Sequence, residues 1–209
     1  MGPDYEMEKA ALDAGALHVA GVDEVGRGPL AGPVTAGAVI LDASCIPEGL
    51  NDSKKLSLKK RVALTEALTQ CAHVSIGHAS VEEIDEHNIL RASHLAMVRA
   101  IAGLPIQPDF VLVDGSMLPR DLTIDAQPVV KGDARCLSIS AASIVAKTAR
   151  DQIMVDLAQQ YPGYGWHTNM GYGSKSHMLA LQNLGVTPHH RRSFKPIHNM
   201  LYQGEIVKP

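Results

Sequence analysis

The sequence predicts an α/β protein in which a mixed β-sheet is flanked by helices and followed by a small C-terminal helical extension. Strand-length apolar runs rich in β-branched residues occur at 34–41, 72–79 and 110–113, and stretches with helical periodicity separate them. An alanine-rich stretch at 137–161 predicts one long helix whose small side chains allow close packing. With 209 residues, 45% hydrophobic and 20% charged, the chain has the composition of a globular protein.

The first part of the chain is predicted to form a pair of neighbouring strands. Residues 1–15 are acidic and alanine-rich and suit a short helix or a loose arm. Strands at Leu17–Val22 and Val34–Leu41 are joined by a turn rich in glycine and proline. The glycines of this turn are spaced as in a dinucleotide-binding loop. However, Pro29, Pro33 and the strand after them leave no helix to hold a pyrophosphate, which excludes that function.

Helices and strands then alternate. We expect a helix at Leu58–Thr69 with Ser57 as its N-cap, and one continuous helix from Val81 to Ile101 that Gly103 and Pro105 end. The remaining predicted elements are strands at Ala72–Ala79, Phe110–Val113 and Pro128–Val130, the long helix at Leu137–Tyr161, and a helix at about Ser174–Leu184.

Composition favours a cytoplasmic protein. Three cysteines, Cys45, Cys71 and Cys136, are far apart in the sequence and are expected to be reduced thiols. No apolar run reaches the length of a membrane span, and the first residues lack the pattern of a signal peptide. The formal net charge of -3 argues only weakly against nucleic-acid binding, because clustered acids can mask local basic character.

Two adjacent acids follow directly on the apolar run of the first strand. Successive strand residues point to opposite faces, so Asp23 and Glu24 cannot both lie on one solvated side. A carboxylate that is buried needs a partner, and a hard divalent cation is a natural one. Gly26 and Gly28 allow the backbone to approach a ligand closely, and Arg27 between them offers donors suited to phosphate. This stretch predicts phosphodiester chemistry.

Two further acids follow later strands. Asp114 ends the run at 110–113, and Asp133 follows the short strand near 128–130. Taken singly, an aspartate beside a glycine is more simply a turn residue. Taken with Asp23 and Glu24, they predict a cluster of carboxylates, which repel one another unless cations bind them. Two magnesium or manganese ions held there could activate a water and stabilise the leaving oxygen. The ten histidines form no metal-binding pattern and are expected to be structural or exposed.

A series of motifs resembles that of ribonuclease HII, in order and over most of the chain from about Leu17 to Ile197. The matching stretches are Asp23-Glu24-Val25-Gly26-Arg27-Gly28, Asn51-Asp52-Ser53-Lys54-Lys55-Leu56, Leu112-Val113-Asp114-Gly115, Lys131-Gly132-Asp133, Ala141-Ala142-Ser143-Ile144-Val145-Ala146-Lys147, Gly171-Tyr172-Gly173 and Arg192-Ser193-Phe194.

The resemblance implies a ribonuclease H-like fold, with a catalytic core at 1–161 and a C-terminal helical segment at 162–209 that packs on the core and contributes to substrate binding. It implies an endonuclease dependent on Mn²⁺ or Mg²⁺ that hydrolyses RNA in RNA/DNA hybrids. It further implies a cut 5′ of single ribonucleotides in duplex DNA, leaving a 3′-hydroxyl and a 5′-phosphate, in the service of ribonucleotide removal. The expected catalytic, metal-binding acids are Asp23, Glu24, Asp114 and Asp133.

Substrate contacts also follow from the resemblance. Gly26, Arg27 and Gly28 would read the 2′-hydroxyl largely with backbone groups, and this hydroxyl is what distinguishes RNA from DNA. Tyr172 would stack on the sugar after the ribonucleotide. The residues expected at the phosphate backbone are Lys54, Ser143 and Lys147.

Four further residues bear on substrate binding. Lys147 lies amid apolar residues of a predicted helix, so it must extend to solvent or meet an anion. Arg191 and Arg192 would bind DNA or simply solvate the tail. Met170 stands where related sequences often carry a lysine before Gly-Tyr-Gly, which removes a phosphate contact.

Two other functions fit the same fold. A non-catalytic nucleic-acid-binding module would gain nothing from four carboxylates facing phosphate, and a junction resolvase would lack the Gly-Arg-Gly and Gly-Tyr-Gly turns. The expected partners are RNA/DNA hybrids and ribonucleotide-containing duplex DNA, with no membrane. The protein is expected to be a monomer, and residues 205–209 contain no recognisable docking motif.

Overall fold

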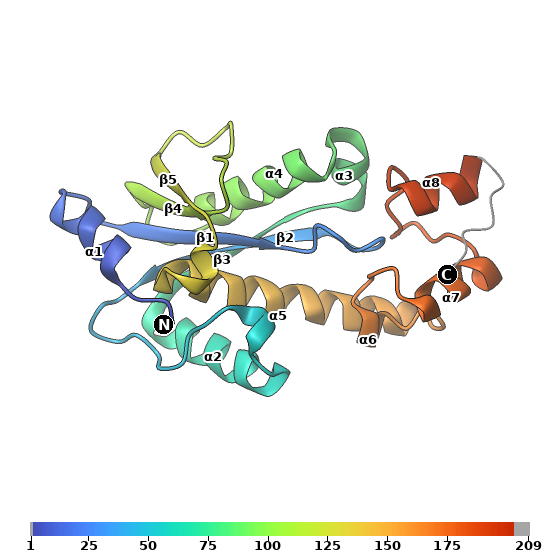
Figure 1. The fold of residues 1–209 in the computed structure, drawn as a ribbon, viewed down its shortest axis with the longest axis horizontal. Coiled ribbons are helices and arrows are strands. Elements are labelled where there is room, and N and C mark those ends of the chain that lie inside the picture. The colour runs from blue at the N-terminus through green and yellow to red at the C-terminus, as the bar shows by residue number, and fades with distance from the viewer. Residues whose placement is uncertain (1, 203–209) are drawn as a thin grey trace.

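The computed structural model describes residues 2–202, in which a five-stranded mixed sheet lies between two layers of helices (Figure 1). The strand order is β3-β2-β1-β4-β5; β2 is antiparallel to β1 and β3, whereas β4 is parallel to β1 and β5. This confirms the predicted fold class and the hairpin-like pair. The strands are β1 (Val19–Val25), β2 (Val34–Leu41), β3 (Ala72–Ala79), β4 (Phe110–Asp114) and β5 (Asp125–Val129).

The helices cover the sheet unequally. α4 packs against β2 and β3 on one face, and α5 packs against β1 and β2 on the other, with α2 beside it (Figure 1). The helices are α1 (Glu6–Asp13), α2 (Leu58–Cys71), α3 (Val81–His87), α4 (Ile89–Ala102), α5 (Leu137–Gln160), α6 (Trp166–Asn169), α7 (Lys175–Leu184) and α8 (Lys195–Tyr202). Short 3₁₀ turns occur at Ser53–Lys55 and Gly132–Ala134.

The two faces of the sheet follow from residue alternation in the central strands. On β1 and β2, Ala20, Val22 and Ala38 belong to the core shared with α4. Val39 on β2 belongs instead to the core shared with α2 and α5. Because neighbouring residues alternate in this way, Asp23 and Glu24 start from opposite faces of β1.

Glycines allow α5 to lie close to the sheet. A methyl group on Gly37 of β2 would come 2.5 Å from the Ala142 carbonyl oxygen, and one on Gly21 of β1 would overlap the backbone at Ser138. The small residues of α5 likewise allow the helix backbone to approach the sheet closely. This close packing brings Ser143 on α5 to the level of Asp23.

Most predicted elements match the structure, and two shifts have physical causes. β1 runs three residues past Val22 because its pairing with β2 continues to Val25. The last strand begins at Asp125, earlier than predicted, and Pro128 is tolerated there because β5 is an edge strand.

The prediction of one helix from Val81 to Ile101 is wrong. The chain breaks at Asn88, whose φ of 71° lies in the left-handed region. The Asn88 side-chain oxygen then accepts from the amides of Leu90 and Arg91 at 3.0 and 3.2 Å, which starts α4 afresh. A capping amide of this kind interrupts a helix without altering its apolar periodicity.

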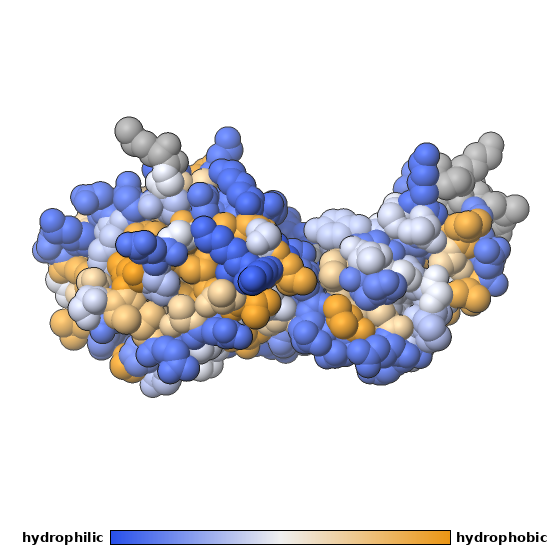
Figure 2. All heavy atoms as spheres, turned by 90° about the horizontal axis from the view of Figure 1, so that it is seen from below, coloured by the Kyte–Doolittle hydropathy of each residue, from blue (hydrophilic) through white to orange (hydrophobic). Residues whose placement is uncertain are grey.

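The C-terminal helices share a core with the rest of the protein. Trp166, Leu181 and Ile197 pack with Met154 of α5 and with Leu30 from the turn between β1 and β2. Figure 2 shows this part as a smaller lobe joined to the main body by a waist. The proposed tail at 205–209 lies outside the described residues. Among residues 2–202, no helix combines the length and apolar character that a bilayer span requires.

Candidate active site

Three of the predicted acids meet at one end of the sheet. One oxygen each from Asp23, Glu24 and Asp114 lies within 4.8 Å of the others. β4 pairs in parallel with β1 up to Val22 and Val113, so the next residue on each strand is an acid of the cluster. Asp133 is not within this group, although its negative charge adds to the effect of burial in raising the pKa of Asp23.

Asp23 is the most enclosed of these acids, with 7% of its surface exposed. Burial raises its pKa well above the ordinary value, and the charges of Glu24 and Asp114 raise it further. A hydrogen bond from Ser143 opposes the shift. Positive charge placed beside Asp23 would therefore favour its carboxylate form.

Asp114 and Asp133 are held next to each other by a turn. The Gly132 amide donates to Asp114 Oδ1 at 2.7 Å, and Lys131 before it adopts a left-handed conformation with φ of 58°. Burial raises the pKa of both aspartates, and the charge of Glu24 adds to the shift of Asp114. Three acids with pKa values raised by burial and mutual repulsion form an environment that a divalent cation would relieve.

Lys54 lies close enough to the acids for their negative charges to affect its pKa. Burial alone would lower its pKa, but the charges of Asp133, Asp52, Asp23 and Asp114 outweigh that effect and raise it. Its loop is well defined: the Asp52 side chain accepts from the Lys54 amide at 2.9 Å, and Ser53 Oγ lies 2.8 Å from Ser143 Oγ. The sequence-predicted residues Lys54 and Ser143 are thus both brought to the acid cluster.

Lys147 has an anion partner within the protein. Its Nζ lies 2.6 Å from Asp151 Oδ1, and Arg61 Nη2 lies 3.3 Å from the other oxygen of the same carboxylate. Arg61 also donates to the Leu56 carbonyl at 2.8 Å. Asp151 therefore links the long helix to the loop that carries Lys54, and Lys147 is part of that link.

The Gly-Arg-Gly turn stands between the acids and Tyr172. Arg27 Nη1 contacts Glu24 Oε1 at 3.1 Å, although the Arg27 side chain is 49% exposed. A methyl group on Gly28 would lie 3.3 Å from the ring of Tyr172, which is itself exposed. Within residues 2–202, the amides of Arg27 and Gly28 donate to no acceptor, so both remain available to a ligand.

Two fully buried arginines hold this turn, and sequence reasoning did not predict either role. Arg191 donates to the carbonyls of Gly26, Arg27 and Gly32 at 2.6, 3.0 and 2.9 Å. Its expected role in DNA binding or tail solvation is therefore wrong, because the side chain is wholly enclosed. Burial, with the charge of Arg150, lowers its pKa to about 9.

Arg150 on α5 also donates to backbone carbonyls of the segment between β1 and β2. It donates to the carbonyls of Pro33, Met170 and Ala31 at 3.0, 3.0 and 3.1 Å, and burial lowers its pKa to about 10. Met170 is thus tied through its backbone, in a left-handed conformation with φ of 50°. In the sequence, Arg150 lies in an alanine-rich helical stretch and Arg191 lies in a run of basic residues. Neither pattern indicates that the side chain would donate to backbone carbonyls.

His177 holds the backbone of Tyr172, and His190 lies against His177. Trp166 Nε1 donates to His177 Nε2 at 3.0 Å, which leaves the His177 Nδ1 proton for the Tyr172 carbonyl at 2.9 Å. His190 lies behind, 3.1 Å from His177, and burial lowers its pKa to about 3. Both rings are neutral structural groups, in agreement with the sequence expectation for most histidines.

Comparison with known proteins agrees with this site. The family model for ribonuclease HII matches residues 20–197. A ribonuclease HII of Roseobacter denitrificans is 74% identical over 93% of this chain and 98% of its own, and one of Paracoccus denitrificans is 68% identical over 97% of each. The crystal structure of ribonuclease H2 from Pyrococcus horikoshii OT3 has a TM-score of 0.75 at 28% identity, covering 90% of this chain and 98% of that one.

The match spans the sheet, the acid cluster and most of the C-terminal helices. The chain therefore belongs to the ribonuclease HII family and is a ribonuclease H hydrolase that acts on RNA in RNA/DNA hybrids.

Proposed function

We propose that this enzyme also cuts duplex DNA at single embedded ribonucleotides, on the 5′ side, leaving a 3′-hydroxyl and a 5′-phosphate. The observation that carries the proposal is the adjacency of three parts: the acid cluster, the turn at Gly26–Gly28, and the exposed ring of Tyr172 against Gly28. Such a site can test a single nucleotide for its 2′-hydroxyl and the following sugar for its absence.

Asp23, Glu24 and Asp114 would hold the divalent cations, with Asp133 beside them as a further ligand. Their oxygens are close enough to share a cation. Burial and neighbouring negative charge raise the pKa of Asp23 and Asp114, an effect that a bound cation would offset. Mg²⁺ and Mn²⁺ both suit an all-carboxylate site. When bound, such ions activate a water for in-line attack on phosphorus and stabilise the leaving oxygen.

The Gly-Arg-Gly turn would read the ribonucleotide with its backbone. Arg191 draws the carbonyls of Gly26 and Arg27 inward, while the amides of Arg27 and Gly28 stay unpaired in the described chain. These amides can donate to the 2′-hydroxyl or to the adjacent phosphate. The Arg27 side chain, which pairs with Glu24, can exchange that partner for a phosphate at little cost because it is exposed.

The remaining contacts would orient the strand. Tyr172 would stack on the next sugar, and Lys54 and Ser143 would meet phosphate oxygens beside the acids. Lys147 would act at a phosphate only in competition with Asp151. We further propose that residues 162–209 contribute to substrate binding, and that the enzyme works as a cytoplasmic monomer.

Cleavage of three labelled duplexes tests the proposal: DNA with one ribonucleotide, all-DNA, and a continuous RNA/DNA hybrid. Each is assayed with Mg²⁺, Mn²⁺ or chelator, for the wild type and Asp23→Asn. We expect a metal-dependent cut 5′ of the ribonucleotide that the variant loses. Cleavage of the hybrid alone would refute recognition of single ribonucleotides, and cleavage of all-DNA would refute reading of the 2′-hydroxyl.

A further inference from the structure

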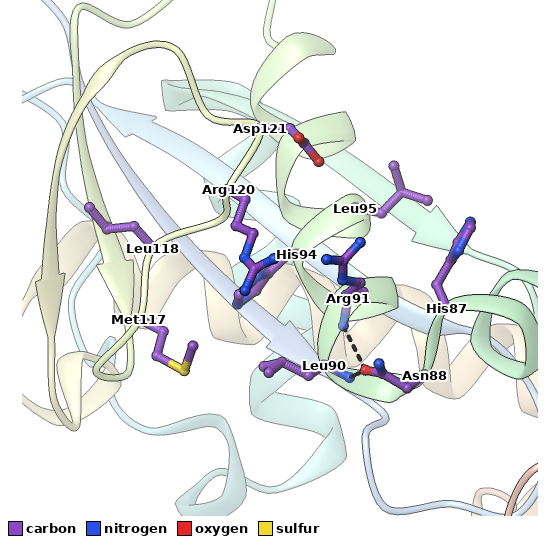
Figure 3. Close-up of a pocket in the computed structure, with 10 residues that line it drawn as sticks. All are labelled: His87, Asn88, Leu90, Arg91, His94, Leu95, Met117, Leu118, Arg120 and Asp121. Carbon is purple, nitrogen blue, oxygen red and sulfur yellow. Dashed lines mark hydrogen bonds between the residues drawn. The ribbon is translucent and has the colours of Figure 1, made fainter.

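Two connected hollows extend from the acids across the surface. The inner one, of about 260 Å³, is lined by Glu24, Arg27 and Asp114 together with residues of α4. The outer one, of about 520 Å³, lies between α4 and the loop at 115–124 (Figure 3). The two share Leu90, His94 and Met117 as lining residues, so they lie next to each other and are here called the groove, with its inner end at Glu24 and Asp114.

The outer part of this groove is basic. Arg91 projects from α4, and Arg120 reaches from the opposite loop toward His94 (Figure 3). His94 lines both hollows, so it lies where they meet. Burial lowers its pKa, and the positive charges of Arg27 and Arg120 add to that effect. Asp121 is the acid among the lining residues of the outer hollow.

The two arginines are free to take a ligand. Within residues 2–202, neither Arg91 nor Arg120 donates from its guanidinium to a carboxylate or a carbonyl. Most other arginines of the chain are engaged, as Arg99 is with Glu83 at 2.6 Å. Unpaired guanidinium groups that face one another across a groove are suited to the oxygens of a phosphate.

The groove walls suit a nucleotide chain. Met117 and Leu118 are 53% and 37% exposed on the loop and offer apolar surface for sugar or base. The inner hollow connects these walls to the acids, so a strand whose phosphate lies at the acids can continue along the groove.

We propose that Arg91 and Arg120, with His94 between them and the acids, form a second phosphate-binding subsite for the backbone of the substrate duplex. This inference rests on the proposed function, because the groove becomes a substrate path only if the cut takes place at the acids. Its ligand is a phosphodiester of the duplex several positions from the cut.

The test compares Arg91→Gln, Arg120→Gln and the double variant with the wild type. Lys9→Gln is the matched control, since Lys9 is an exposed cation on α1, before the opposite end of β1 from the acids. Binding to the ribonucleotide-containing duplex is measured by fluorescence anisotropy in chelator across a salt series, and kcat and KM are measured with Mg²⁺.

For the double variant we expect the slope of log Kd against log salt to fall by about two, one for each phosphate contact. KM should rise roughly ten-fold at 0.1 M salt, as expected for two exposed ion pairs together. The kcat value should stay within about two-fold, because neither arginine touches the acids.

Shortened duplexes locate the contact. Removing base pairs on one side of the ribonucleotide should make the wild type and the double variant bind equally, because the strand then no longer reaches the groove. A double variant that matches Lys9→Gln on the full-length duplex would overturn the subsite, and so would a difference that survives shortening on both sides. Loss of ribonucleotide cleavage by the wild type would instead overturn the proposed function, which separates the two failures.

Discussion

Arg191 holds the carbonyl of Gly26 at 2.6 Å, across 165 residues of sequence, from a fully buried position. Among residues 2–202, no carboxylate pairs with it. The guanidinium instead satisfies four carbonyls of the segment between β1 and β2. It also lies 5.1 Å from the ring centre of Phe194, which adds a favourable cation–π contact. The turn beside the acids is therefore shaped by the C-terminal part of the chain.

Replacing Arg191 by methionine should destabilise the protein by about 3 kcal/mol or more, because several buried carbonyls lose their donor together. Urea denaturation measures this change. Arg192→Met is the matched control: Arg192 is exposed, and within residues 2–202 its one hydrogen bond is from its backbone amide to Asp85, at 2.9 Å. Its effect should stay within about 0.5 kcal/mol. Equal losses for the two variants would show that Arg191 does not hold the turn.

The two glycines of the turn should respond differently to alanine. Gly26 has a φ of 93° and faces Arg150, so Gly26→Ala should cost about 2 kcal/mol or more of folding stability. Gly28 has no such φ, and its methyl group would only press on the Tyr172 ring. Gly28→Ala should therefore fold normally and raise KM for the ribonucleotide-containing duplex. A stable Gly26→Ala with normal KM would contradict this division.

Asp23 should weaken the metal-free protein at neutral pH. Its folded pKa is raised, so the folded state binds more protons than the unfolded state, and stability falls as pH rises above the ordinary aspartate range. In chelator, Asp23→Asn should thus be more stable than the wild type at pH 7, with a smaller gain near pH 4. Thermal unfolding across pH measures this, with exposed Asp125→Asn as the control.

Divalent cations should reverse that order. Binding to the folded state stabilises it in proportion to the logarithm of cation concentration above the dissociation constant, by about 2.7 kcal/mol at a hundred-fold excess. We expect Mn²⁺ or Mg²⁺ to raise the melting temperature of the wild type and to leave that of Asp23→Asn nearly unchanged. Equal shifts in both proteins would place the cation elsewhere.

Ser143 should affect the pH at which kcat/KM falls on the acidic side of the pH–rate profile. Its hydrogen bond lowers the pKa of Asp23, so Ser143→Ala should raise that pKa and move the acid limb of kcat/KM to higher pH. Ser140→Ala is the control, because the Ser140 hydroxyl is buried on the same helix without a partner in the described chain. An unshifted limb for Ser143→Ala would show that the hydroxyl does not act on Asp23.

The parts of the fold that depend on local patterns could be predicted from the sequence. β2 and β3 lie at the predicted bounds, and α5 ends one residue from its predicted end. Alternation, β-branched residues and a long alanine-rich stretch encode these elements within a few residues of chain. The motif series likewise identified the family, and the strand ends indicated the acids.

Which side chains come into contact depends on how the elements pack together. The tertiary structure brought Asp23, Glu24 and Asp114 together and left Asp133 outside the closest group, because register between strands sets those distances. It gave Lys147 an internal carboxylate and turned Arg191 inward, through contacts between residues remote in sequence. Residue types and spacing carry no record of such partners, since burial and direction arise only when separate elements pack.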